Sequence, residues 1–142
     1  MPPQQITVAA PQIDLSARII DTTTVGASPT AAAETIIGTL TIPNFAGIAV
    51  MQRIYLGGWA AFTVGTAGTA ANLRIRQTNV TGTVIAATGA LTGGIAAAAL
   101  VAQDVCGSDA SPGVAVYVLT LQVTSATAGS TVSALQLYAL VV

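Results

Sequence analysis

The chain has 142 residues, with only four basic and five acidic side chains, no histidine and a net charge of -1. Four basic side chains are too few for the basic surface that non-specific nucleic-acid binding needs. The lack of histidine excludes catalytic triads and metal sites that depend on histidine. A soluble domain of this length usually carries roughly 35 charged residues, so we expect neighbouring subunits to cover part of the neutral surface.

Residues 1–13 are rich in proline, which removes hydrogen-bond donors and favours extended chain. We expect an extended N-terminal arm over 1–13 and a single β-sandwich domain over 14–142. The arm is expected to lie on a neighbouring subunit, with a frayed terminus as the alternative. It lacks the basic and long apolar regions of a secretory signal. The arm residues expected to bind a partner are Pro2, Pro3, Gln4, Gln5, Ile6 and Pro11.

Alternation of β-branched or apolar residues with polar ones predicts short strands along the rest of the chain. In chain order, the expected strands are 16–24, 34–42, 47–56, 59–64, 71–78, 83–87, 114–124 and 131–142. In the strand over 34–42, Ile36 and Gly38 are expected on one face and Ile37 on the other. The pair Gly57-Gly58 is expected to interrupt the chain between two strands.

The segment between residues 91 and 112 gives conflicting signals. The alanine run within 91–102 has high helix propensity, while Gly93-Gly94 and the surrounding β-rich sequence favour a loop or a strand. Residues 103–112, which contain Asp104 and Asp109, are expected to form a loop.

The spacing of these strands predicts an all-β fold, an antiparallel β-sandwich or jelly-roll-like barrel of about eight strands with an extended N-terminal arm. Two charge-free stretches, 77–103 and 110–142, are long enough to cross a membrane as helices. Turn-rich interruptions and period-two alternation favour strands instead, so we expect no transmembrane helix and no membrane partner.

Chemistry-bearing groups are scarce in this sequence. Asp104 and Asp109 form the only local pair of carboxylates, and a solvated loop is favoured over a calcium site at this spacing. The turn at 65–68 lacks the lysine of a phosphate-binding loop. The single Cys106 excludes an internal disulfide, and we expect a small buried thiol. We therefore expect no cofactor, no metal and no enzymatic activity.

Arginine supplies all the positive charge of the chain. Arg74 and Arg76 alternate with Leu73 and Ile75, which we expect to point inward, so both guanidinium groups project from one face. We expect Arg74 and Arg76 to pair with carboxylates of a neighbouring subunit, since arginine forks match carboxylates. We expect the same of Arg53. The alternative is that these arginines are solvated on an outer face.

Aromatic residues make up only 4% of the chain. Trp59 and Phe62 are expected in the core. Tyr117 and Tyr138 are expected at an interface, because a tyrosine hydroxyl tolerates a half-wet setting.

The segment 59–69, followed by Leu73-Arg74-Ile75-Arg76, resembles β-sandwich accessory proteins of bacteriophage capsids, as do the segments 118–124 and 130–142. This resemblance covers about the last hundred residues. It implies a capsid decoration (cement) protein or a small jelly-roll capsid component at the virion surface. A homotrimer on the major capsid protein is the assembly that the resemblance implies, with residues 1–13 clasping an adjacent subunit.

Two other functional classes remain open. One is a self-assembling filament or pilus subunit in which the N-terminal arm donates a strand to its neighbour. The other is a receptor-binding or glycan-binding module at a tail tip, which ranks lower because it needs an aromatic platform and aromatic residues are few.

Overall fold

The structure is a computed structural model that describes residues 18–23, 25–26, 28–29, 33–42, 53–65, 70–91, 95–110, 113–124 and 130–141. The expected arm over 1–13 lies outside the described residues, as does the first part of the strand expected over 47–56. The strands are β1 (Arg18–Thr22), β2 (Thr35–Thr41), β3 (Ile54–Thr63), β4 (Ala70–Gln77), β5 (Val84–Ala87), β6 (Leu100–Asp109), β7 (Val116–Thr124) and β8 (Thr131–Val141). The described part of the chain holds no helix that could span a membrane.

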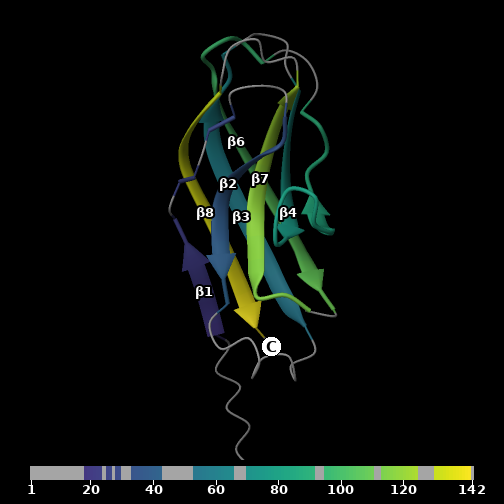
Figure 1. Ribbon diagram of the computed structural model, residues 1–142. Coiled ribbons are helices and arrows are strands. Elements are labelled where there is room, and N and C mark those ends of the chain that lie inside the picture. Colours follow the sequence, from purple (N-terminus) through teal and green to yellow (C-terminus); the bar gives the residue numbers. More distant parts are fainter. Residues whose placement is uncertain are drawn as a thin grey trace, which may run out of the picture.

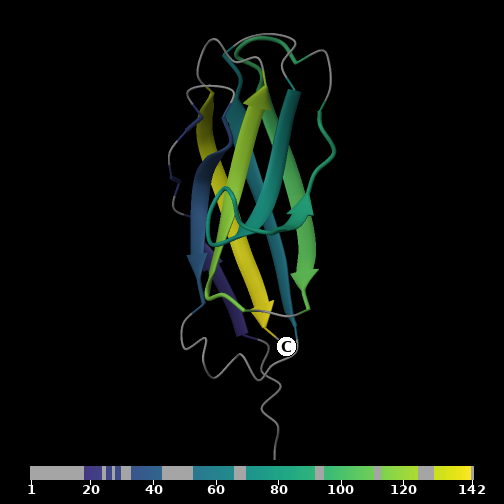
Figure 2. The same ribbon diagram turned by 45° about the vertical axis from the view of Figure 1, so that its right-hand side comes forward.

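Two antiparallel sheets face each other, and each has four strands (Figures 1 and 2). Sheet I has the order β1-β8-β3-β6, and sheet II has the order β2-β7-β4-β5. The first strand therefore pairs with the eighth, the second with the seventh, the third with the sixth and the fourth with the fifth. Such nested pairing is that of a long antiparallel hairpin wrapped around itself, which is a jelly roll. The predicted all-β sandwich is confirmed.

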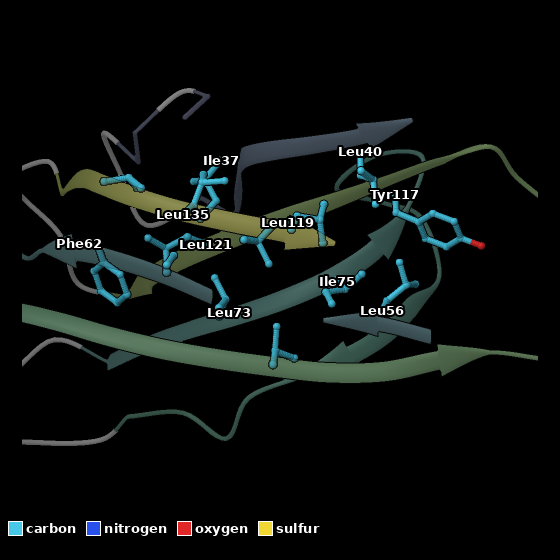
Figure 3. Packing of buried hydrophobic residues seen from close by; sticks show 14 of the residues in the cluster. Ile37, Leu40, Leu56, Phe62, Leu73, Ile75, Tyr117, Leu119, Leu121 and Leu135 are labelled. Carbon is cyan, nitrogen blue, oxygen red and sulfur yellow. The ribbon is translucent and has the colours of Figure 1, made fainter. Parts of the chain in front are cut away.

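The inner faces of the two sheets enclose one apolar core (Figure 3). Its side chains come from alternate positions of the strands, because successive residues of a strand point to opposite faces. Leu73 and Ile75 are fully buried, as the sequence predicts. Each fully buried aliphatic or aromatic side chain contributes about 1.5–3 kcal/mol through removal from water. The largest are Tyr117, Phe62, Ile37, Ile42, Ile54, Leu73, Ile75, Leu119, Leu121 and Leu137.

Gly57 and Gly58 lie inside β3, so the interruption expected there is wrong. Gly58 faces the core, where a Cβ atom would lie 3.0 Å from Cδ1 of Leu119. Gly57 faces outward under the ring of Tyr138, whose nearest atoms would lie 2.2 Å from an added Cβ. These glycines make room for neighbouring side chains and leave the strand continuous.

A β-bulge interrupts the alternation of β2. Ile36 pairs with Thr120 and Gly38 pairs with Leu119, which leaves Ile37 as the extra residue. Ile37 and Gly38 are both buried, so the expectation that they lie on opposite faces is wrong. A bulge adds one residue to one strand and thereby changes which side chains reach the core.

The segment 100–109 forms β6, so the loop expected over 103–112 is wrong for most of its length. Leu100 through Asp109 pair with β3 at ten consecutive positions, and this ladder overrides the local turn signals. The alanine run before it contains a turn at 97–98, in which Ala98 has a φ of 61°.

Replacing Leu119 with alanine tests the packing between the sheets. Leu119 is fully buried in β7 and lies against the backbone of Gly58. We expect Leu119→Ala to lower the free energy of unfolding by about 2–5 kcal/mol, because it leaves a cavity. Leu100→Ala, at a side chain that is 69% exposed, is the matched control and should change it by less than about 0.5 kcal/mol. Urea unfolding at low protein concentration measures both, and equal effects would contradict the assigned core.

Candidate assembly interface

The outer face of sheet II carries a network of charged and polar side chains. Arg76 donates from Nε and Nη2 to the two carboxylate oxygens of Glu34, at 2.7 and 2.9 Å, and from Nη1 to the carbonyl oxygen of Gly82 at 2.9 Å. Nη1 of Arg74 lies 3.3 Å from Oε2 of Glu34 and donates to Gln122 at 3.0 Å. Thr120, buried in β7, donates its hydroxyl to the same carboxylate. One carboxylate thus collects two arginines and a hydroxyl.

The carboxylate that Arg74 and Arg76 meet is therefore one of their own chain. Glu34 precedes β2, and the strand order β2-β7-β4 brings it across β7 to the two arginines of β4. Each of the three side chains is at most 20% exposed. A partner-binding role for Arg74 and Arg76 stays a prediction, and this internal pairing removes the reason that the sequence offered for it.

The arginines also set the ionisation of Glu34. Burial favours the neutral acid, but hydrogen bonds from Arg76 and Thr120 and the charges of both arginines outweigh it and lower the pKa of Glu34. Glu34 is therefore ionised throughout the neutral range, and its charge offsets one of the two arginine charges on the outer face of sheet II.

The outer face of sheet I is different, because it exposes large apolar side chains. Tyr55 and Trp59 lie at odd-numbered positions of β3, whose even-numbered positions fill the core. They are 44% and 38% exposed, Tyr138 of β8 is 40% exposed, and Leu100 of β6 is 69% exposed. We call these four residues the apolar face. Phe62 is in the core as predicted, whereas the core position expected for Trp59 is wrong.

Polar groups border this apolar face along β1, β8 and β6. Trp59 donates from its indole nitrogen to Oε1 of Gln136 at 3.3 Å, and Gln136 donates to Oδ2 of Asp21 at 3.4 Å. On the other side, Trp59 pairs in register with Asp104, which is exposed. Aromatic rings surrounded by such a polar rim are typical of protein–protein contact surfaces.

A shallow hollow lies within this face. It is lined by Tyr55, Leu56, Cys106, Gly107, Ser108, Tyr138 and Leu140. The register aligns Cys106, Gly57 and Tyr138 in one row across β6, β3 and β8, and the ring of Tyr138 covers Gly57 and forms one side of the hollow. Cys106 is exposed, and the buried thiol expected from the sequence is wrong.

Arg53 lies just before β3, with its guanidinium carbon 6.0 Å from the ring centroid of Tyr55. It is exposed and adds a positive charge beside the apolar face. Its partner-binding role stays a prediction. The other predicted partner-binding residues belong to the segment 1–17, outside the described residues.

Asp104 and Asp109 do not form a joint site, because they are five positions apart in β6 and therefore lie on opposite faces of the strand. Asp109 is buried and accepts hydrogen bonds from the hydroxyl of Tyr117 at 2.9 Å and from Gln77 at 2.7 Å. Burial and the contact with Asp109 raise the pKa of Tyr117. Tyr117 is fully buried, so the interface position expected for it is wrong. Among the described residues no cluster could hold a metal ion.

Sequence reasoning missed Tyr55 and Leu100. A signal for Tyr55 was present, since Tyr55 and Trp59 are four residues apart and share a face of any continuous strand. The expected interruption at Gly57-Gly58 concealed this relation. Leu100 was missed because β6 was expected to be a loop over most of its length.

No protein-family model matches the sequence, and no curated protein matches it. Among solved structures, the VP2 subviral particle of infectious bursal disease virus is similar, with a TM-score of 0.57 and 13% identity over 89% of this chain and 33% of that chain. The T13 particle of this virus gives a TM-score of 0.59 and 11% identity over 93% and 35% of the two chains. The chain spans about a third of the length of these viral chains.

A protein from the disulfide-linked pili of Bacillus endospore appendages matches with a TM-score of 0.46 and 15% identity, over 98% of this chain and 99% of that one. That similarity is too distant to establish a common fold. The viral chains share the fold of this chain, at identities that carry no statement about its partners.

Replacing Glu34 tests the polar network. We expect Glu34→Gln to lower the free energy of unfolding at pH 7 by about 1–3 kcal/mol, because charged hydrogen bonds are lost and two arginines remain without their carboxylate. Since folding lowers the pKa of Glu34, its contribution is full above the ordinary value of 4.5 and disappears as the pH falls through the folded-state value.

The difference between wild type and Glu34→Gln should therefore shrink in acid, as measured by urea unfolding across pH. Asp104→Asn removes an exposed carboxylate and is the control, with an expected change below about 0.5 kcal/mol. A difference that stays constant down to pH 2 would contradict the assigned pairing.

Proposed function

We propose that this protein is a non-enzymatic structural component of a virus particle and acts through contacts between subunits. Within that class, we propose a capsid decoration (cement) protein or minor capsid component at the virion surface. Its partners would be copies of itself, as a homotrimer, and the major capsid protein. The jelly-roll strand order and the similarity to chains of viral particles support the class; the decoration role comes from the sequence resemblance.

The apolar face is the observation that carries this proposal. Four large apolar side chains are exposed on the outer face of sheet I. The chain has few charges that could repel another protein from this face. Contiguous exposed apolar surface on a soluble domain marks a binding site. Trp and Tyr are also the residues that most often dominate the binding energy of such a site. The outer face of sheet II is a poorer candidate, because its charges are partnered internally.

A filament subunit remains the second candidate. A contact between two different surfaces of the same protein closes into a ring or propagates as a filament, depending on the rotation between neighbours. Light scattering and negative-stain microscopy of the purified protein distinguish the two outcomes, since discrete trimers support decoration and fibres support the filament.

The glycan-binding alternative gains from the position of the aromatic rings. Tyr55, Trp59 and Tyr138 are exposed on one face although aromatic residues are few. Binding of the protein to a glycan array, with loss of binding in Trp59→Ala, would favour this alternative over the decoration role.

Truncation of the apolar face tests the proposed function. We expect Trp59→Ala to weaken association with itself or with capsids at least tenfold, which corresponds to about 1.4 kcal/mol at an interface hot spot. Val84→Ala on β5, where Val84 is 43% exposed, is the matched control and should leave association unchanged. Sedimentation velocity and particle co-sedimentation measure the effect. Equal association of both variants would exclude the apolar face as the interface.

Removal of residues 1–13 tests the arm. We expect the truncated protein to remain folded, because the core residues that the structure describes lie in β2 and later in the chain, and to bind neighbouring subunits or particles more weakly. Circular dichroism monitors the fold, and co-sedimentation with particles monitors binding. Unchanged particle binding by the folded, truncated protein would count against the arm.

A further inference from the structure

The strand order of the two sheets leaves β1, β6, β2 and β5 at sheet edges. Edge strands expose backbone hydrogen-bonding groups, and proteins usually protect them by short length, a bulge, proline or charged side chains, lysine above all. β1 has five residues, β5 has four, and β2 contains a bulge. β6 has ten residues, follows β3 without a bulge and contains neither lysine nor proline. Among the described strands, β6 is thus the long and regular edge, and its two charged residues are the exposed Asp104 and the inward-facing Asp109.

The outer side of β6 also borders the apolar face. Leu100 is the most exposed large apolar side chain of the described residues, and Cys106 lines the hollow with Tyr55 and Tyr138. An extended segment that pairs with β6 would gain backbone hydrogen bonds from the edge and apolar contacts from the side chains along it.

The segment before β1 has a sequence suited to this edge. Between Pro3 and Pro11 the chain runs for seven residues without proline, Gln4-Gln5-Ile6-Thr7-Val8-Ala9-Ala10, and carries no charge. Proline cannot donate to a β-ladder, so the two prolines delimit the part that can pair. Ile6, Thr7 and Val8 are β-branched, as strands prefer. Seven residues extend over about 23 Å, well within the roughly 33 Å of the ten-residue β6.

We propose that residues 4–10 of one copy pair with β6 of a second copy and extend its sheet I by a fifth strand. This inference rests on the proposed function in that it requires the protein to act through contacts between copies. A second copy is the favoured donor because the proposed function requires contacts between copies and because β1 and β6 are at opposite edges of sheet I. Within one chain, residues 11–17 would have to bridge the three strand spacings between these edges, about 14 Å.

Cys106 can test whether an added strand lies beside β6, because a disulfide forms only over a short distance. Cys106 is the only cysteine of the chain and is exposed on the outer side of β6. In an added strand, every second side chain would point to the same side as Cys106. Only a position nearly opposite Cys106 brings the two Cα atoms within the roughly 4.4–6.8 Å that a disulfide permits.

The experiment is a cysteine scan of the full-length protein, from Gln4→Cys through Ala10→Cys, one substitution at a time. After mild oxidation, non-reducing electrophoresis measures disulfide-linked dimers. We expect one position to give the highest yield, several-fold above its two direct neighbours, with weaker cross-links two residues to either side of it. Adding Cys106→Ser to the variant with the highest yield should abolish its cross-link, which excludes disulfides between two arms.

Three results would overturn the inference in different ways. Uniform yields or no cross-links, in oligomers that still form by light scattering, would exclude strand addition and leave the proposed function standing. A disulfide within one chain would show that the segment pairs with its own β6. Protein that stays monomeric and binds no particle would exclude the proposed function as well.

Discussion

The close fit of side chains between the two sheets is the constraint on which the other features depend. Leu119 from sheet II approaches the backbone of β3 at Gly58, where any side chain would need space that is already occupied. Once the even-numbered positions of β3 fill this core, Tyr55 and Trp59 must point away from it. The apolar face is therefore a consequence of the core, and the chain has no alternative register that would bury both sets of residues.

The same constraint divides the charges between the two outer faces. Sheet II brings Glu34 to Arg74 and Arg76, so three of the nine charged residues are used inside one subunit. The rim of sheet I keeps Asp21 and Asp104, both exposed. The outer face of sheet I therefore carries its charges at the rim, around the exposed rings of Tyr55, Trp59 and Tyr138.

Periodicity alone predicted the strands whose alternation is uninterrupted, such as β4 with Leu73 and Ile75 inward. It failed where pairing with a distant strand decides the outcome. The ladder between β3 and β6 overrides Gly57-Gly58 and the turn-like residues around Asp109, and neither effect can be derived from local sequence. The pairing of Arg74 and Arg76 with Glu34 also could not be predicted from the sequence, because only the strand order makes Glu34 their neighbour. The exposure of Trp59 was within reach, since Trp59 and Phe62 are three residues apart and cannot both face inward from one regular strand.

The buried carboxyl group of Asp109 has a role that the aliphatic core cannot perform. It extends from β6 in sheet I to Tyr117 and Gln77 in sheet II, and it accepts a hydrogen bond from each. Sliding one sheet past the other by a single residue would separate these donors from the buried carboxyl group of Asp109. Contacts between leucine, isoleucine and valine depend less on direction than hydrogen bonds do. Asp109 therefore favours the stacking of the two sheets that keeps both of these hydrogen bonds.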